Sequence, residues 1–160
     1  MYWLVYYCVD KLFGYVKMEI PTKKVGIMKF STRTTYGLRA MIKLANNWPK
    51  KAVSLSVIAR QEKISFKYLE RIFARLRQAG LVESEKGTSG GYRLSRDPTQ
   101  IKIYDIVKVL EGHLTLFYCL DENGKVHCSS DKPCNVGLVL AKVQLAIIKT
   151  LQGIVLRDLI

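Results

Sequence analysis

The sequence predicts a mainly α-helical fold with a small β-wing, in which a winged helix-turn-helix domain is followed by a long C-terminal dimerisation helix. The first observation is the order of elements between Ser54 and Leu94: a short helix, a tight turn, a longer basic helix, and two short strands around a glycine-rich tip. This order is typical of a winged helix-turn-helix. The second is a stripe of apolar residues spaced by three or four positions between Val136 and Ile154. Such a stripe is typical of a helix that packs against a partner helix.

The first two helices are predicted from their caps and from apolar residues at helical spacing. Thr32–Asn47 carries an apolar stripe, and Ser31 or Thr32 is its expected N-cap. A second, shorter helix is expected directly after Ser54, which is a favourable N-cap residue.

The third helix and the wing follow a turn at Glu62–Ile64. Ser65 is the expected N-cap of the third helix, and Gly80 is expected to end it as a C′ glycine. Short strands at Leu81–Glu85 and Gly91–Ser95 then flank a tip whose glycines permit the positive φ angles of a tight turn.

Three further segments make up the C-terminal part of the chain. A short amphipathic helix is expected at Tyr104–Glu111, little regular structure at Phe117–Pro133, and one long helix at Asn135–Leu159. The chain is therefore expected to divide into an N-terminal extension (1–27), a winged helix-turn-helix DNA-binding domain (28–112), a cysteine-bearing sensor loop (113–134) and a dimerisation helix (135–160).

The N-terminal extension differs in composition from the rest. Met1–Val9 is apolar but short, and it lacks the positively charged start and the cleavage site of a signal peptide. We expect translation of the natural protein to begin at Met28, because the codons for Lys23–Gly26 must be purine-rich enough to encode a ribosome-binding sequence. The alternative is an additional helix that packs on the dimer.

The charge of the chain indicates a polyanionic partner. Its net charge is +13 and its pI is about 9.7 in 160 residues, of which 49% are hydrophobic. Membrane surface and nucleic acid both fit this charge. The sequence has no uninterrupted apolar run of about 20 residues, and its basic residues lie within the helix-turn-helix. We therefore expect a cytoplasmic nucleic-acid-binding protein without a membrane partner.

The candidate DNA contacts lie on the third helix, the wing and the first helix. Base identity is read by side chains near the start of a recognition helix, which in this chain are Ser65, Lys67, Glu70 and Arg71. Arg75 and Arg33 are expected to contact phosphates, and Lys86 beside Gly87 is expected to enter the minor groove. The alternative is that these charges only solvate an exposed helix face. This alternative explains any single residue better than it explains the whole set.

Three segments resemble a known family. They are Met28-Lys-Phe-Ser-Thr with Tyr36-Gly-Leu-Arg-Ala, Ile64-Ser-x-x-Tyr68-Leu-Glu-x-Ile-Phe-x-x-Leu76-Arg-x-Ala-Gly80-Leu-Val, and Gly87-x-x-Gly90-Gly-Tyr-x-Leu94. On these motifs and the downstream cysteines, the chain from Met28 to Ile160 resembles the Rrf-two family of bacterial winged-helix regulators, in particular its IscR- and NsrR-like iron–sulfur members. The resemblance implies a homodimer that binds a pseudo-palindromic operator in double-stranded DNA. It also implies that Lys67, Glu70 and Arg71 occupy the major groove and Lys86 the minor groove.

Cys119, Cys128 and Cys134 are the candidate metal ligands, with eight and five residues between them. Thiolates suit iron–sulfur clusters and zinc, because soft ligands bind soft metals. The resemblance implies that these cysteines bind an iron–sulfur cluster, [2Fe–2S] in preference to [4Fe–4S]. The second gap matches the family pattern, whereas the first is longer. Metal-free thiols and a zinc site stay open as alternatives.

The fourth ligand of such a cluster is not identified by the sequence. In some family members a histidine shortly after the last cysteine supplies it, but Gly137 occupies that position here. In others an acidic residue of the partner subunit's first helix does so, where this chain has Thr35. The remaining candidates near the cysteines are Asp121, Glu122, His127 and Asp131.

These patterns together predict a sequence-specific transcriptional regulator, expected to act as a repressor. Its operator affinity is expected to depend on an iron–sulfur cluster that senses redox conditions, nitric oxide or iron–sulfur status. The alternative is a metal-free regulator of the same fold controlled by a metabolite or a protein partner. An iron–sulfur electron carrier is less favoured, since it needs no basic recognition helix. An enzyme is not expected, because no P-loop, HExxH motif or serine–histidine–aspartate set stands out in the sequence.

Overall fold

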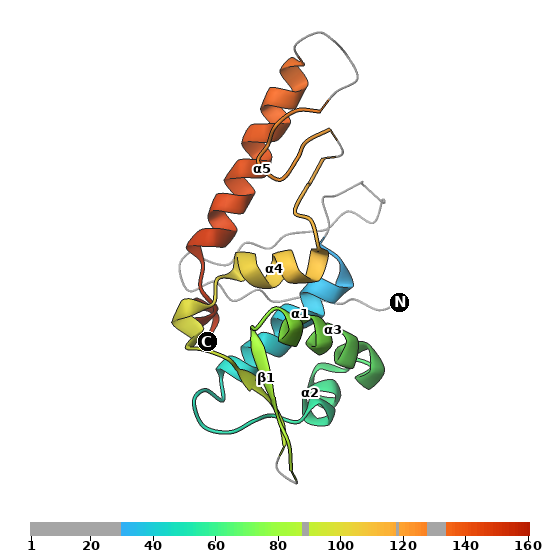
Figure 1. Cartoon of the computed structure of the whole chain (residues 1–160), viewed down its shortest axis with the longest axis vertical. Helices are drawn as coiled ribbons and strands as arrows, with labels where there is room; N and C mark the ends of the chain where they lie inside the picture. Colours follow the sequence, from blue (N-terminus) through green and yellow to red (C-terminus); the bar gives the residue numbers. More distant parts are fainter. Residues whose placement is uncertain (1–29, 88–89, 118, 128–133) are drawn as a thin grey trace, which may run out of the picture.

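A computed structural model of the chain describes residues 30–87, 90–117, 119–127 and 134–160. The proposed start at Met28, the extension before it and Cys128 lie outside these residues. The described elements are, in chain order, α1 (Thr32–Ala45), α2 (Leu55–Glu62), α3 (Phe66–Gln78), β1 (Val82–Glu85), β2 (Gly91–Leu94), the 3₁₀ helix η1 (Pro98–Gln100), α4 (Ile103–Glu111), α5 (Asn135–Gly153) and the 3₁₀ helix η2 (Leu156–Leu159). In Figure 1, α1–α4 and the two strands form one body, and α5 extends away from it as an arm. The predicted fold class is confirmed.

The core lies among α1, α3 and α4, where the predicted apolar faces meet. Its largest fully buried side chains include Met41 of α1, Phe73 of α3 and Ile106 of α4. Gly37 allows α1 and α4 to approach closely, because a Cβ atom at this position would overlap the side chain of Leu110. The burial of these faces removes apolar surface from water, which is the main favourable contribution to folding.

The turn between α2 and α3 forms as its sequence predicts. The Ser54 side chain accepts a hydrogen bond from the N–H of Ser56 at 3.3 Å and so caps α2. Lys63 ends α2 in the left-handed region at φ 55°. Glu62 holds α2 against α1 through ion pairs with Arg39 at 2.6 Å and Lys43 at 3.4 Å. These ion pairs therefore join the first two helices at the surface of the domain.

The two ends of α3 differ in how they are capped. Ser65 is the N-cap residue as expected, but its side chain makes no capping hydrogen bond. At the other end Gly80 has φ +68°, its N–H donates to the carbonyl of Arg77, and the N–H of Leu81 donates to the carbonyl of Leu76. These two bonds form a Schellman motif, which confirms the C′ role predicted for Gly80.

The wing is an antiparallel pair of strands in which Val82 faces Leu94 and Glu85 faces Gly91. A third segment joins it that the sequence pattern does not predict. Val53 exchanges two backbone hydrogen bonds with Tyr92, at 2.8 and 2.9 Å. This contact ties β2 to the loop before α2.

The C-terminal helix is shorter than predicted, which corrects the expected helix at Asn135–Leu159 within segment 135–160. It ends at Gly153, and Ile154 is extended with φ −101° and ψ 130°. The carbonyl of Ile154 accepts from the N–H of Ile103 at 2.9 Å, and the N–H of Leu156 donates to Ile101 at 2.8 Å. Leu156 is completely buried. The last residues therefore return to the winged domain, and their pairing and burial there offset the loss of helical hydrogen bonds after Gly153.

Candidate DNA-binding surface and cysteine loop

The solvent face of α3 carries the predicted major-groove residues. Ser65, Lys67, Glu70, Arg71 and Arg75 are all exposed, whereas the apolar residues of α3 that contact the core, Leu69, Ile72, Phe73 and Leu76, are at most 1% exposed. Within the described part of the chain, none of these five polar side chains forms an ion pair. Their charges are therefore available to a ligand.

The two strands of the wing lie with α2 and α3 on the side of α4 opposite to α5 (Figure 1). Lys86 and Gly87 are both exposed, and Gly87 has φ +122°. The acidic residue Glu83 on β1 is paired with Arg93 on β2 at 3.0 Å. The elements that carry the predicted α3 residues and the predicted wing residues thus lie on the same side of α4.

Arg33 is the predicted DNA contact on α1. It is half-buried at the start of α1, and its Nε is buried without a hydrogen-bond partner among the described residues. Its charge acts on Glu111 at the end of α4, whose Oε1 accepts from the N–H of Ser31 at 2.8 Å. Burial alone would raise the pKa of Glu111, but the nearby hydroxyl of Thr34, the hydrogen bond from the N–H of Ser31 and the charge of Arg33 together hold this pKa below its usual value.

The first cysteine stands at the base of a small hairpin. The carbonyl of Cys119 accepts from the N–H of His127 at 2.7 Å, and Leu120 bridges Val126. The Asp121 carboxylate closes the turn by accepting from the N–H groups of Asn123 at 2.9 Å and Lys125 at 2.8 Å. The hydrogen bond from Lys125, followed by those from His127 and Asn123, holds the pKa of Asp121 below its usual value despite partial desolvation. Part of the segment predicted to be irregular is therefore ordered by its own backbone.

The last cysteine begins α5. Cys134 is the N-cap residue, and its Sγ accepts from the N–H of Gly137 at 3.3 Å. Val126 of the hairpin packs against Gly137 so closely that an added Cβ atom would lie 2.8 Å from a Val126 methyl group. The hairpin that follows Cys119 and the helix that follows Cys134 are thus in direct contact.

A buried glutamine joins the same two elements further along α5. Gln144 is 0% exposed. Its Oε1 accepts from the N–H of Leu116 at 3.0 Å, and its Nε2 donates to the carbonyl of Asp121 at 2.6 Å. One side chain of α5 therefore holds the segment just before Cys119 and the turn just after it.

The described thiols fit the ligand class of an iron–sulfur cluster. Cys119 and Cys134 are free and half-buried, and their segments are packed together. Cys128 lies outside the described residues, and those that are described contain no group of three histidine, cysteine, aspartate or glutamate side chains placed to hold a metal ion. Thiolates suit a cluster more than a hard cation.

The acidic and histidine candidates for a fourth ligand are engaged in other contacts. Glu122 pairs with His113 at 2.9 Å and with Lys108 at 3.3 Å. His127 lies 3.4 Å from Asp121. Asp131 is outside the described residues. Any of the described candidates would have to give up one of these contacts to bind a cluster.

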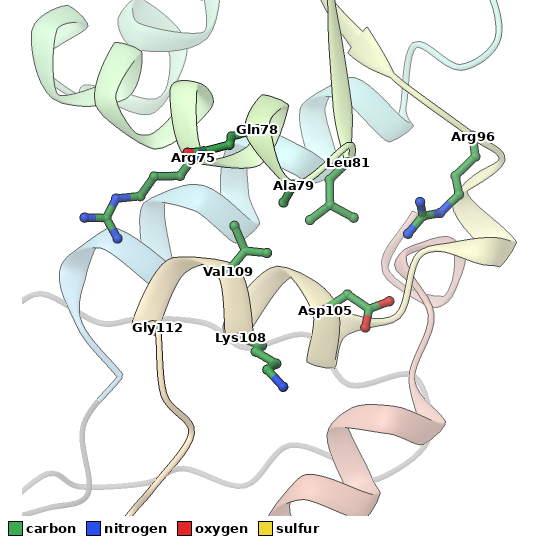
Figure 2. Close-up of a pocket in the computed structure, with 9 residues that line it drawn as sticks. All are labelled: Arg75, Gln78, Ala79, Leu81, Arg96, Asp105, Lys108, Val109 and Gly112. Carbon is green, nitrogen blue, oxygen red and sulfur yellow. The ribbon is translucent and has the colours of Figure 1, made fainter. Parts of the chain in front are cut away.

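An open pocket lies between the end of α3 and α4, separate from the cysteines. Figure 2 shows Arg75 and Arg96 at its two sides and Asp105 and Lys108 along α4. Arg75 is the only residue of the predicted site in its lining. This position, toward the C-terminal end of α3, is consistent with a phosphate contact more than with base reading.

Two site residues were missed by sequence reasoning. Gln144 is polar within an apolar stripe, and that break in the pattern was a signal for a buried hydrogen-bonding role. Phe66, the first residue of α3, is 47% exposed.

Several apolar side chains of α5 are exposed. Val136, Leu138, Val139, Val143 and Leu145 are each at least 41% exposed. Of the predicted stripe, Val136 and Val143 are therefore exposed, whereas Leu140, Ile147 and Leu151 are half-buried. By length and composition alone α5 is apolar enough to cross a membrane. Buried Gln144 and exposed Lys142 and Lys149 lie within it.

Comparison with known proteins identifies the family. A family model described as Rrf2, iron-dependent transcriptional regulator, matches residues 30–160. The regulator NsrR of Bacillus subtilis is 35% identical over 133 residues, which cover 83% of this chain and 90% of NsrR. The structure of CymR, the global cysteine regulator of B. subtilis, superposes with a TM-score of 0.71 at 34% identity and covers 83% of this chain and 96% of CymR. That of T. potens IscR gives a TM-score of 0.67 at 37% identity and covers 82% and 85%. The chain therefore belongs to the Rrf2 family of winged-helix transcriptional regulators.

Proposed function

We propose that this regulator binds a pseudo-palindromic operator as a homodimer, and that its affinity depends on an iron–sulfur cluster held by Cys119, Cys128 and Cys134. The observation that carries the proposal is the contact between the cysteine hairpin and α5. It links the candidate ligands to the helix that is expected to form the dimer interface.

The DNA-binding part of the proposal is supported by the unpaired charges of α3. Arg71 is expected to fork to guanine and Glu70 to accept from cytosine, each pair contributing about 1–3 kcal/mol of base discrimination. Lys67 and Arg75 are expected to neutralise phosphates, and Lys86 to enter the minor groove from the wing. All five side chains are exposed.

The dimer is supported by the exposed apolar face of α5. A helix of 19 residues with this much apolar surface in water is stabilised by a second copy of itself. Two winged domains related by a two-fold axis then place their recognition helices about 34 Å apart, one turn of DNA. We assign the apolar face to this contact and not to a membrane, because Lys142 and Lys149 lie along the exposed side of α5.

The sensing part depends on how the cysteine loop is attached. A bound cluster would join the three thiolates through iron–sulfur bonds. Oxygen, nitric oxide or iron shortage would remove the cluster and so break these bonds. The side chain of Gln144 and the packing of Val126 on Gly137 carry the position of the loop to α5. A change in the position of the loop then changes the position of α5, and with it the spacing of the two recognition helices. We expect repression to be the outcome of tight binding.

Two experiments test these parts separately. For DNA binding, duplexes that bind the wild-type protein are selected from a random pool. Their affinity is then measured for the double variant Lys67→Ala/Arg71→Ala. The control is Lys102→Ala/Lys149→Ala, which removes the same charge from exposed positions outside α3. The first pair should lose at least about tenfold in affinity and the second little. Sequence-specific binding that survives in the first pair would contradict the assignment.

For the cofactor, protein purified without oxygen should be brown. The visible absorbance should be lost in Cys128→Ala and kept in Cys8→Ala, a matched cysteine in the N-terminal extension. A colourless wild-type protein would contradict the proposed cluster.

A second candidate is a metal-free regulator controlled by a metabolite or a protein partner. It is favoured by the similarity to CymR, the global cysteine regulator of B. subtilis, which has the higher TM-score of the two structures compared above. In that case the colourless protein would still bind its operator, and a small molecule or partner protein would change the affinity.

A further inference from the structure

Phe66 is an exposed aromatic side chain at the start of the recognition helix. It is the first residue of α3, follows the N-cap Ser65, and is 47% exposed. The other aromatic residues of α3 are packed: Phe73 is fully buried, and Tyr68 lies edge-on against Tyr36 with ring centroids 6.1 Å apart. Phe66 therefore makes no large contribution to the core.

The surroundings of Phe66 are polar and mainly cationic. Lys67 follows it directly, Lys63 ends the preceding helix, and Glu70 lies one turn later on the same side of α3. All three are exposed. The positive charges favour a polyanion at this face, and the aromatic ring offers that polyanion an apolar contact.

Duplex DNA presents one prominent apolar group in its major groove, the 5-methyl group of thymine, and phenylalanine is among the side chains that contact it. The residues that reach base edges in a helix-turn-helix come from the N-terminal part of the recognition helix, where Phe66 lies. We propose that Phe66 reads a thymine in each half-site by packing against its methyl group. This inference rests on the proposed DNA-binding function and adds a specificity-determining residue to it.

The role separates Phe66 from its charged neighbours. Lys67 attracts phosphates of any sequence, and Arg71 and Glu70 select G·C pairs. Phe66 adds selection for T·A at one position, where a cytosine lacks the methyl group. The operator should therefore contain a fixed thymine beside the positions that Glu70 and Arg71 read.

The test replaces the methyl group without changing base pairing. Duplexes are selected from a random pool with the full-length protein, and each thymidine of a selected half-site is then replaced by deoxyuridine. At one thymine, or at two neighbouring ones, wild-type affinity should fall about fourfold, the value of one buried methyl-sized group. In Phe66→Ala and Phe66→Gln the same replacement should have no effect. Circular dichroism identifies a variant that does not fold, in which case the other variant decides.

The matched control is Phe30→Ala, which removes another exposed phenylalanine, 41% exposed and outside α3. It should keep the full effect of deoxyuridine. A deoxyuridine effect of equal size in wild type and both Phe66 variants, or no effect at any thymine, overturns the inference while leaving sequence-specific binding intact. If no duplex is enriched from the pool, the proposed DNA-binding function fails, and the role of Phe66 fails with it.

Discussion

Replacing Gln144 with leucine should release the cysteine loop from α5. Leucine has a similar volume but no polar atoms, so the N–H of Leu116 and the carbonyl of Asp121 lose their partners at 3.0 and 2.6 Å. A typical hydrogen bond contributes about 1 kcal/mol net. Leu116 and Asp121 are half-exposed, so water replaces part of what is lost. The two bonds together therefore correspond to about 2 kcal/mol.

This magnitude gives two measurable effects of Gln144→Leu. The equilibrium between the attached and the released loop should shift by about thirtyfold, since about 1.4 kcal/mol is a factor of ten. The melting temperature should fall by about 4–8 °C for a chain of this size. Calorimetry measures the second effect, and hydrogen exchange at the Leu116 amide measures the first.

The control for this prediction is Gln152→Leu, which changes an exposed glutamine of the same helix. Its melting temperature and the exchange rate at Leu116 should stay within the error of the wild type. If the two variants behave alike, Gln144 does not hold the loop, and the proposed path from the cysteines to α5 is wrong.

Three further perturbations follow from the structure. The folded-state pKa of Glu111 lies below its usual 4.5, so its carboxylate contributes fully to the free energy of unfolding above pH 4.5. This contribution disappears as the pH falls through the lower folded-state pKa. Urea unfolding should show this loss of stability at acid pH in wild type and less of it in Glu111→Gln. Gly37→Ala should lower the free energy of unfolding by about 1–3 kcal/mol, because its methyl group meets Leu110, whereas Gly153→Ala, with nothing within 4 Å, should not destabilise. Val139→Glu, at a position 61% exposed on α5, should give a monomer by light scattering, whereas Lys149→Glu on the same helix should stay dimeric.

The helix-turn-helix and the wing were predictable because their signals are local. Ser54 caps α2 through its own side chain, and Gly80 ends α3 with the left-handed angle that its position requires. Each of these residues acts on backbone groups within a few positions of itself. A pattern read along the chain is therefore sufficient to find them.

The errors concern contacts between distant segments. The end of α5 at Gly153 depends on pairing between Ile154 and Ile103, and the extra wing contact depends on Val53 meeting Tyr92. Neither segment has a sequence pattern that names its partner. Gln144 and Phe66 were missed for a related reason, since burial of the first and exposure of the second depend on what packs around them.

The candidate site divides in the same way. The exposed charges of α3 follow from helical spacing, and the structure leaves their side chains exposed. Arg33, by contrast, is half-buried at the start of α1, where its charge acts on Glu111 at the end of α4. The contact between the hairpin after Cys119 and the start of α5 arises from the packing of Val126 on Gly137, which cysteine spacing alone does not reveal.

The most direct measurement is the affinity of the full-length dimer for its selected operator, compared between protein prepared without oxygen and the same protein after removal of bound iron. The proposed function predicts that the two dissociation constants differ by about tenfold or more, and that Cys128→Ala binds like the iron-free protein while Cys8→Ala responds like wild type. Equal dissociation constants for both preparations would contradict the proposal that the cysteine loop controls the affinity for DNA.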